Sequence, residues 1–412
     1  MTKKTRKLIL YCLVLGFFLA AGGFLFYSFG WSLNPTANDF FTFKKTGAVF
    51  LKIWPADAQI KINGKSYSPK RDMFGNGGSE LIKGLLPGNY QIEILKENFG
   101  SWKKSLTVEA GLISGASKIF LFPKKIPTET VSRPEAEKFW LTENKKEEIK
   151  KIFNSLKQKQ LKMPGEVPVT QIISYPFNTS KSIITTQKAV YILDRQNFSL
   201  EILTLNPVKA LVISNSEIAF FDWQDNLQIY NLDSRKITEK IPFKLLNETE
   251  KIAFSKSNIR IALLDNKGNL FVYNRTQKEL KQIIDADKEE GIKDFKFSPD
   301  SKKIAALTRD GEIEIIFLED YHQDFKITAG EKFKLNLSIN SKPLDFDWLP
   351  KILGHLIINY SDKIIAAEVD SRPPANWWVL GENIESFAFD KENNLYFLKD
   401  NQFLKVILNQ NY

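Results

Sequence analysis

Runs in which apolar and polar residues alternate recur along most of the chain, and turn residues separate them. The clearest example is residues 295–317, FKFSPDSKKIAALTRDGEIEIIF, where S-P-D-S at 298–301 and R-D-G at 309–311 divide three such runs. Alternation places every second side chain on one face of a strand, and Ser-Pro-Asp and Asp-Gly are turn sequences. This stretch therefore predicts an antiparallel meander, which cannot bury its apolar face alone.

Similar units recur on both sides of this stretch. Their first strands begin near residues 172, 211, 252, 295, 346 and 387, at steps of about 40 residues with one longer step before Phe346. A repeat of this length built from strands is typical of a β-propeller, in which each repeat forms one four-stranded blade. We therefore expect an all-β fold in which residues 169–412 form about six blades. The sixth unit stops after its third strand, so a segment before the array is expected to complete it, with 138–153 as the candidate.

The array resembles the propellers of WD-repeat and Tol-type proteins. S-P-D at 298–300 followed by D-G at 310–311 matches a phrase that recurs in Tol-type repeats, and residues 389–393 carry a degenerate copy. The resemblance implies the fold. Because the matching residues are turn formers, it implies no catalytic role for them.

An uncharged apolar run of 22 residues extends from Leu8 to Phe29. A helix needs about 20 apolar residues to cross a bilayer, and basic residues precede this run while none directly follows it. We therefore predict a cytoplasmic tail at 1–7, a single-pass transmembrane anchor at 8–30 and a linker at 31–46, with the bulk of the chain outside the cytoplasmic membrane. A cleaved signal peptide is the alternative, but the run exceeds about 7–15 residues and no small-x-small site follows it.

Residues 47–122 carry a second set of alternating runs, with strands expected at 48–53, 58–62, 91–95 and 103–108. The order and spacing of their motifs resemble those of PEGA domains, small β-sandwich modules of bacterial and archaeal envelope proteins. The motifs are P-x-x-A at 55–58, I-x-I-N-G at 60–64, G-L-x-P-G-x-Y at 84–90, F-x-x-W at 99–102 and V-x-A-G at 108–111. An insertion at 66–79 replaces the usual Gly-x-x-Pro of the family. The resemblance implies a small binding or adhesion module and no catalytic residues.

Five prolines punctuate residues 123–168, which are expected to connect the two folded regions. Apolar residues at 149, 152, 153 and 156 fall at helical spacing and predict an amphipathic helix over about 143–160. The segment also resembles the outer hairpin of a repeat, and in that case it would complete a blade.

The formal net charge of +10 includes the basic residues of the tail, and the remainder is spread over a surface rich in both signs. Such a surface lacks the basic stripe that nucleic acid requires, so no nucleic-acid partner is expected, while an anionic envelope polymer or a membrane surface remains open. Cys12 is the only cysteine, which excludes an intrachain disulfide and a cysteine metal site.

Motifs for catalysis or metal binding are sparse. His322 and His355 are far apart in sequence, no nucleophile elbow or HExxH motif occurs, and no cofactor or metal site is predicted. Four aspartates lie in or near innermost strands and could line the propeller channel, namely Asp222, Asp294, Asp345 and Asp347. Channel carboxylates occur in propeller enzymes, but they also serve as structural hydrogen-bond acceptors, and no histidine or arginine lies in step with these.

An aromatic pair, Trp377 and Trp378, could grip a glycan or a protein from the surface, and burial in the core is the alternative. An anchor followed by two β modules without a catalytic constellation favours an envelope protein that binds or scaffolds a glycan or protein partner, and not an enzyme. The alternative is a propeller-borne hydrolase or lyase acting on envelope glycans. Clustering of the channel aspartates with a basic residue would favour that alternative.

Overall fold

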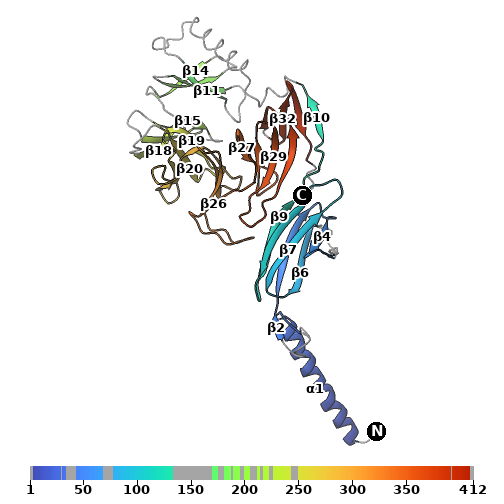
Figure 1. Cartoon of the computed structure of the whole chain (residues 1–412). Helices are drawn as coiled ribbons and strands as arrows, with labels where there is room; N and C mark the ends of the chain where they lie inside the picture. The colour runs from blue at the N-terminus through green and yellow to red at the C-terminus, as the bar shows by residue number, and fades with distance from the viewer. Residues whose placement is uncertain are drawn as a thin grey trace.

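The computed structural model of the chain describes residues 3–28, 30–33, 43–67, 78–132, 169–174, 181–186, 189–194, 199–204, 211–213, 217–221, 226–242, 249–390 and 392–408, and the structural statements below concern these residues. Among them strands predominate, and α1 (Lys3–Ser28) is the one α-helix. Figure 1 shows the helix, a small β domain and a curved array of sheets in succession. This arrangement confirms the expected all-β class.

The N-terminal helix α1 stands apart from the folded domains, and nearly all of its side chains over residues 3–25 are exposed. Its stretch Lys3–Leu25 is long and apolar enough to cross a membrane, a test that a signal sequence near an N-terminus also passes. After α1 the chain forms a hairpin of β1 (Trp31–Leu33) and β2 (Phe43–Lys45). The segment expected as a plain linker therefore contains a short two-stranded sheet.

A small β-sandwich follows. One of its sheets has the strand order β6-β3-β9 and the other β5-β4-β7-β8. The strands are β3 (Gly47–Trp54), β4 (Gln59–Ile62), β5 (Lys65–Tyr67), β6 (Ser79–Leu85), β7 (Gly88–Leu95), β8 (Trp102–Val108) and β9 (Ile113–Phe120). Strand β3 pairs antiparallel with β6 and parallel with β9. The alternation in the sequence explains the core between the sheets, because Val49, Leu51, Ile92, Ile94 and Leu106 all point inward and are almost fully buried.

Six four-stranded antiparallel sheets form the propeller, in agreement with the expected number of blades. Blade 1 comprises β11 (Val169–Ser174), β12 (Lys181–Thr186), β13 (Val190–Asp194) and β14 (Ser199–Thr204), and blade 2 comprises β15 (Leu211–Ile213), β16 (Glu217–Phe221), β17 (Asn226–Asn231) and β18 (Lys236–Pro242). Blade 3 comprises β19 (Thr249–Phe254), β20 (Arg260–Asp265), β21 (Leu270–Asn274) and β22 (Glu279–Ile284), and blade 4 comprises β23 (Ile292–Phe297), β24 (Lys303–Thr308), β25 (Ile313–Phe317) and β26 (Lys332–Lys334). Blade 5 comprises β27 (Asp345–Trp348), β28 (His355–Asn359), β29 (Lys363–Glu368) and β30 (Trp377–Glu382), and blade 6 comprises β31 (Ser386–Phe389), β32 (Leu395–Lys399), β33 (Gln402–Val406) and β10 (Thr128–Val131).

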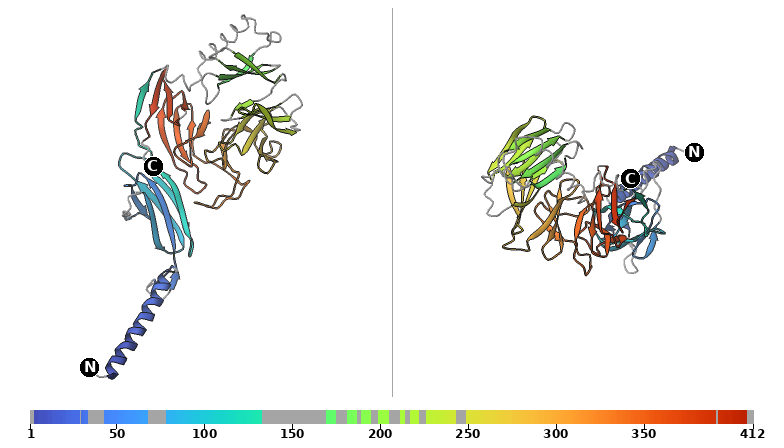
Figure 2. Two further views of the ribbon diagram at one scale, coloured as in Figure 1. Left: turned by 180° about the vertical axis from the view of Figure 1, so that it is seen from behind. Right: turned by 90° about the horizontal axis from the view of Figure 1, so that it is seen from above.

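The first strand of a blade lies innermost, since β15, β19, β23 and β27 contact one another in succession. Figure 2 shows the blades following one another around the array. Because the strands of a blade run alternately up and down, all connections from first to second and from third to fourth strand lie on one face of the propeller. We call this the proximal face, and the opposite one the distal face.

Blade 6 is completed by β10, a strand that precedes the array in sequence. Thr128 to Val131 pair antiparallel with Val406 to Phe403 of β33. A strand from the N-terminal side was expected to close the ring, but the proposed segment 138–153 was wrong, because the closing strand lies nearer the sandwich. Residues 138–153 and the helix predicted over 143–160 lie outside the described residues.

The turns of blade 4 owe their shape to the Ser-Pro-Asp and Asp-Gly sequences. The Ser298 hydroxyl accepts a hydrogen bond from the Lys303 N–H at 2.9 Å, and the Thr308 hydroxyl accepts one from the Glu312 N–H at 2.9 Å. Gly311 has a φ of +95°, which few side chains tolerate. These polar residues therefore hold the meander together.

Candidate functional site

Three of the four aspartates expected at the channel lie on innermost strands of neighbouring blades. Asp294 is in β23 of blade 4, and Asp345 and Asp347 are in β27 of blade 5. Asp222 lies outside the described residues. The fold therefore brings together residues that are about 50 positions apart in the sequence.

Two ion pairs cross between these innermost strands. Lys251 of β19 pairs with Asp294 and donates a hydrogen bond to the Phe295 carbonyl oxygen at 3.1 Å. Lys296 of β23 lies 3.7 Å from a carboxylate oxygen of Asp347. These charged side chains are 28–36% exposed, so water reaches them in part. We call Lys251, Asp294, Lys296 and Asp347 the inner row, and it links blades 3, 4 and 5.

Burial and charge shift the titration of the inner row. Burial lowers the pKa of Lys251, and Asp294 offsets this only in part. Burial raises the pKa of Asp347, against the opposing charge of Lys296. Burial would also lower the pKa of Lys296, but the charges of Asp347, Asp294 and Asp345 outweigh it and raise that pKa. A carboxyl group with a raised pKa suits a general acid, and it is equally what burial alone produces.

The aspartates are also held by their own strands. Asp294, Asp345 and Asp347 each accept a hydrogen bond from the N–H of the next residue, with N–O distances of 2.7–2.8 Å. Among the described residues, no group of three or more histidine, cysteine or acidic side chains comes together to hold a metal. Carboxylates engaged by a lysine and a backbone N–H are typical fixed acceptors, which fits a role in joining blades.

The two tryptophans singled out in the sequence have different environments. Trp378 is 7% exposed and belongs to a hydrophobic core shared by the sandwich and blade 5, so it cannot contact an external partner. Trp377 is 37% exposed at the start of β30. For Trp378 the structure thus supports core burial, and only Trp377 remains a candidate for a surface contact.

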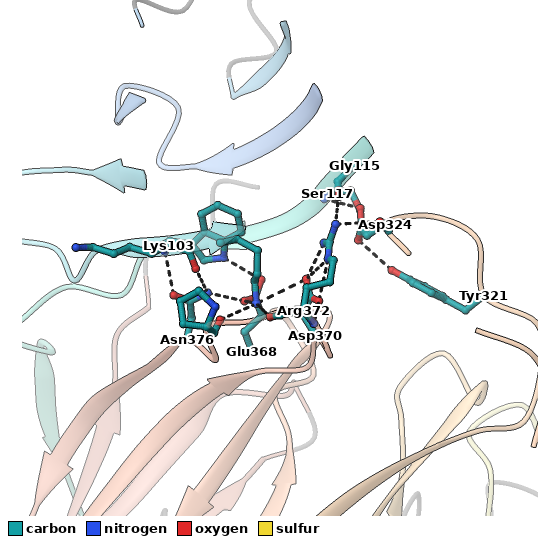
Figure 3. Close-up of polar contacts among 12 residues, drawn as sticks. Lys103, Gly115, Ser117, Tyr321, Asp324, Glu368, Asp370, Arg372 and Asn376 are labelled. Atoms are coloured by element: carbon teal, nitrogen blue, oxygen red, sulfur yellow. Dashed lines mark hydrogen bonds and ion pairs between the residues drawn. The ribbon is translucent and has the colours of Figure 1, made fainter. Parts of the chain in front are cut away.

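The propeller loops cover an edge of the sandwich at β8. An edge strand leaves backbone N–H and C=O groups unpaired on one side. Here the Ser105 N–H donates to the Pro373 carbonyl oxygen at 3.0 Å. The Lys103 N–H donates to Asn376 Oδ1 at 3.0 Å, and its carbonyl oxygen accepts from Asn376 Nδ2 at 2.9 Å (Figure 3). The loop between β29 and β30 therefore acts as a further partner of β8.

The neighbouring edge strand β9 is covered in the same way (Figure 3). The Ser117 N–H donates to Asp324 Oδ1 at 2.7 Å, and the Ser117 hydroxyl lies 2.9 Å from Asp324 Oδ2. The Gly115 carbonyl oxygen accepts from Arg372 Nη1 at 2.7 Å. Both sheets of the sandwich thus pair with loops on the proximal face of blades 4 and 5.

A buried ion network lies between these two edges. The fully buried Lys104 donates to the carbonyl oxygens of Arg372 and Pro374 at 3.0 and 3.1 Å. Its Nζ also lies 2.9 Å from Glu368 and 3.8 Å from Asp370. Arg372 pairs with Asp370 at 2.7 Å, so two cations balance two carboxylates. A buried charge needs such compensation to be tolerated.

Aromatic rings complete the interface. Phe122 of the sandwich lies 5.2 Å from the ring of Trp378 and 5.8 Å from that of His355, between ring centroids. His355 is fully buried, its Nδ1 lies 3.3 Å from the Leu353 carbonyl oxygen, and its Nε2 has no hydrogen-bond partner within the described part of the chain. Burial lowers the pKa of His355 to about 4, so the ring is neutral at pH 7. The two domains therefore share one continuous core.

This interface was missed in the sequence, although β8 contained a signal. Trp102, Lys104, Leu106 and Val108 occupy its inward positions. A lysine at an inward position of an alternating strand indicates a buried charge with a partner elsewhere. The partner itself could not be found, because it lies more than 260 residues away.

On the distal face, loops of blades 4 and 5 enclose an open pocket of about 270 Å³ that is lined by both polar and apolar residues. Its lining comes from residues 311–313, 334–341, 343 and 360. These segments lie in or beside the connections between second and third strands and between blades. The pocket therefore opens away from the sandwich.

Comparison with known proteins adds no family. No family model matches the chain, and no curated protein matches it, so the resemblance to PEGA domains stays a prediction. Among solved structures, the chain is similar to the C-terminal WD40 domain of Sif2, at 12% identity and a TM-score of 0.38, covering 57% of this chain and 66% of that one. It is also similar to the β-propeller domain of Cps50 (Swd1) from Myceliophteria thermophila, at 11% identity and a TM-score of 0.40, covering 59% of this chain and 88% of that one. The propeller assignment itself rests on the sheet topology.

Proposed function

We propose that this chain is a membrane-anchored protein of the cell envelope that presents its propeller to a protein or glycan partner. In this proposal α1 is the anchor and the sandwich is a rigid seat for the propeller. The observation that carries it is the interface between the two domains, where propeller loops pair with β8 and β9 around the buried Lys104 network. Domains joined by a weak interface move independently, whereas an interface with a shared core and buried charges holds one orientation.

The fixed orientation of the propeller on the sandwich determines which face of the propeller is uncovered. The contacts to the sandwich come from residues 321–324, 349–355 and 368–378, which lie in or border proximal connections. The sandwich and α1 therefore lie on the proximal side of blades 4 and 5 (Figure 1). The sandwich therefore does not cover the distal face with its pocket, and this uncovered face is the surface that we propose for the partner.

Site-specific photo-crosslinking in cells tests this proposal. A photo-reactive amino acid replaces Lys342, which is exposed on the distal face, or Lys278, which is exposed in a proximal turn of blade 3 and serves as the matched control. We expect adducts of defined mass at 342 and none at 278, with a band for a protein partner and a glycosidase-sensitive smear for a glycan. Equal adducts at both positions, or none at either, would count against a distal partner surface.

A second candidate, a hydrolase or lyase acting on envelope glycans, is favoured by one observation. The inner row does gather aspartates with lysines, and the pKa of Asp347 is raised by burial. The test is release of fragments from purified envelope glycans by the full chain and by Asp347→Asn. If the unaltered protein releases no fragments, or if both proteins release them equally, Asp347 does not act as a catalytic group.

A further inference from the structure

We propose that the base of the β-sandwich docks onto an anionic lipid bilayer beside the point where α1 leaves it. The base is defined as the turn 109–113 together with Trp31, Lys44, Lys45 and Lys83. This inference rests on the proposed function, because it requires α1 to span the membrane. It adds a lipid surface as a second contact of the folded domain.

A short chain of hydrogen bonds fixes the base to the end of α1. The backbone N–H and the hydroxyl of Thr46 both donate to the Gly30 carbonyl oxygen at 2.7 Å. The Thr46 carbonyl oxygen accepts from the Gly111 N–H at 2.9 Å, and the Ala48 N–H donates to the Leu112 carbonyl oxygen at 3.0 Å. Because α1 ends two residues before Gly30, the turn lies directly beside the helix end (Figure 1).

The length of α1 places this end at the level of the lipid headgroups. Its 26 residues extend about 39 Å at about 1.5 Å per residue. A bilayer is about 30 Å thick in its hydrocarbon core and about 40–45 Å with its headgroups. A helix that begins on the inner side therefore ends within the outer headgroup layer, and the hydrogen-bonded turn lies there with it.

Large apolar side chains of the base are exposed where this bilayer would be. Leu112 and Ile113 are 56% and 63% exposed, and Trp31 is 38% exposed. Single exposed apolar residues are ordinary on a protein surface, but these three belong to connected segments. Trp31 of β1 pairs with Lys45 of β2, and the Lys45 side chain lies over Gly111 in the turn that carries Leu112 and Ile113. Tryptophan is enriched at membrane interfaces, and leucine and isoleucine gain from entering the acyl boundary.

The charges of the base suit anionic lipids. Strand register places exposed Lys83 opposite Ala48, and Ala48 opposite Ile113, so a lysine and the apolar tip share the outer face of one sheet. The end of the Lys45 side chain, from Cδ to Nζ, lies over Gly111, and Lys45, like Lys44, is exposed. Lysines of this kind place their stems on apolar surface and their ammonium groups among phosphates. The exposed Glu109 is the one acidic residue of the base, which leaves a positive excess.

Fluorescence quenching in lipid nanodiscs tests the inference with the full chain. In a Cys12→Ser background, Leu112→Cys carries an environment-sensitive fluorophore, and Leu344→Cys is the matched control, because Leu344 is 59% exposed in a distal connection. The nanodiscs contain either phosphatidylcholine alone or a mixture with phosphatidylglycerol, and spin-labelled lipids serve as quenchers. A third sample carries the fluorophore on the natural Cys12 within α1 and reports whether the helix is in the bilayer.

We expect the label at 112 to be quenched and shifted to shorter emission wavelength, more strongly with phosphatidylglycerol, while the label at 344 is unaffected. Changing Lys44, Lys45 and Lys83 together to glutamine should abolish the dependence on phosphatidylglycerol. If the label at Cys12 is quenched but the label at 112 shows the same emission as the label at 344, the lipid-docking inference fails, while the proposal that α1 is a membrane anchor is supported. If Cys12 is not quenched, the proposed anchor itself fails. If the unlabelled Leu112→Cys variant oxidises to a disulfide-linked dimer, the base contacts a second copy of this chain and not the lipid, and the inference is overturned.

Discussion

Replacing Lys104 by methionine should loosen the seat of the propeller on the sandwich. Removing one partner of a buried ion pair destabilises a protein by about 3–5 kcal/mol, because the other charge remains buried. In this interface Glu368 keeps hydrogen bonds from Trp102 Nε1 at 2.9 Å and Asn376 Nδ2 at 2.8 Å. We therefore expect the lower end of the range, about 3 kcal/mol, for the free energy of opening the interface.

Hydrogen exchange of the full chain in nanodiscs measures this opening. The Ser105 N–H, bonded to Pro373 across the interface, reports it directly. A loss of about 3 kcal/mol corresponds to a roughly 150-fold increase in the exchange rate of this amide, at about 1.36 kcal/mol per tenfold change. Strand β4, which pairs with β7 inside the sandwich, should keep its protection.

The adjacent Lys103 supplies the matched control. Its side chain is 57% exposed and pairs with Glu93 at 2.7 Å. A surface pair contributes about 0–1 kcal/mol, so Lys103→Met should change the exchange of Ser105 only slightly. Equal exchange in the two variants would refute the argument that the buried Lys104 network holds the domains together.

Three further outcomes are expected in urea denaturation of the full chain. Gly100→Ala should lower the unfolding free energy by about 1–3 kcal/mol, because a Cβ at Gly100 would overlap the indole of Trp378; an unchanged midpoint would contradict this. Lowering the pH from 7.5 to 5 should remove about 2 kcal/mol through His355, because its folded-state pKa of about 4 lies below its usual 6.5 and the unfolded chain therefore takes up the proton first. This loss sets in below about pH 6.5 and should be absent from His355→Phe, so an equal loss in that variant would argue against it. Asp294→Asn should lower the unfolding free energy by only about 1 kcal/mol, since its pair with Lys251 is partly exposed. A loss as large as that of Lys104→Met would contradict the argument that this pair contributes little to stability.

Local patterns predicted the strands and turns of the propeller well. The alternating runs of 295–317 became β23, β24 and β25, and the turn residues between them make the hydrogen bonds that such sequences favour. The closing strand was missed for a physical reason. Residues 128–131, TETV, form an outermost strand whose side chains are mostly exposed, so no apolar alternation marks it.

Contacts between distant segments could not be predicted from such patterns. The sequence indicated the aspartates of the inner row but not Lys251 and Lys296, because each pair joins strands of different blades. Whether Trp378 is buried or exposed could not be decided from the sequence. A second domain can pack on a blade and bury a side chain that would otherwise lie on the propeller surface. The face that the sandwich covers is determined by contacts between residues far apart in the sequence, and the local alternation of apolar and polar residues does not indicate it.

The position of β10 at the start of the array affects how the chain is made on the ribosome. Its partner β33 emerges only after on the order of 270 further residues, which takes roughly 15–55 s at typical rates of translation. During that interval β10 is a nascent strand with open edges, and such strands pair wrongly with other chains when they are long and apolar. A four-residue strand with threonine and glutamate at its first three positions avoids this danger. The polar residues that leave β10 without an apolar alternation thus also make it a poor template for pairing with other chains before β33 is synthesised.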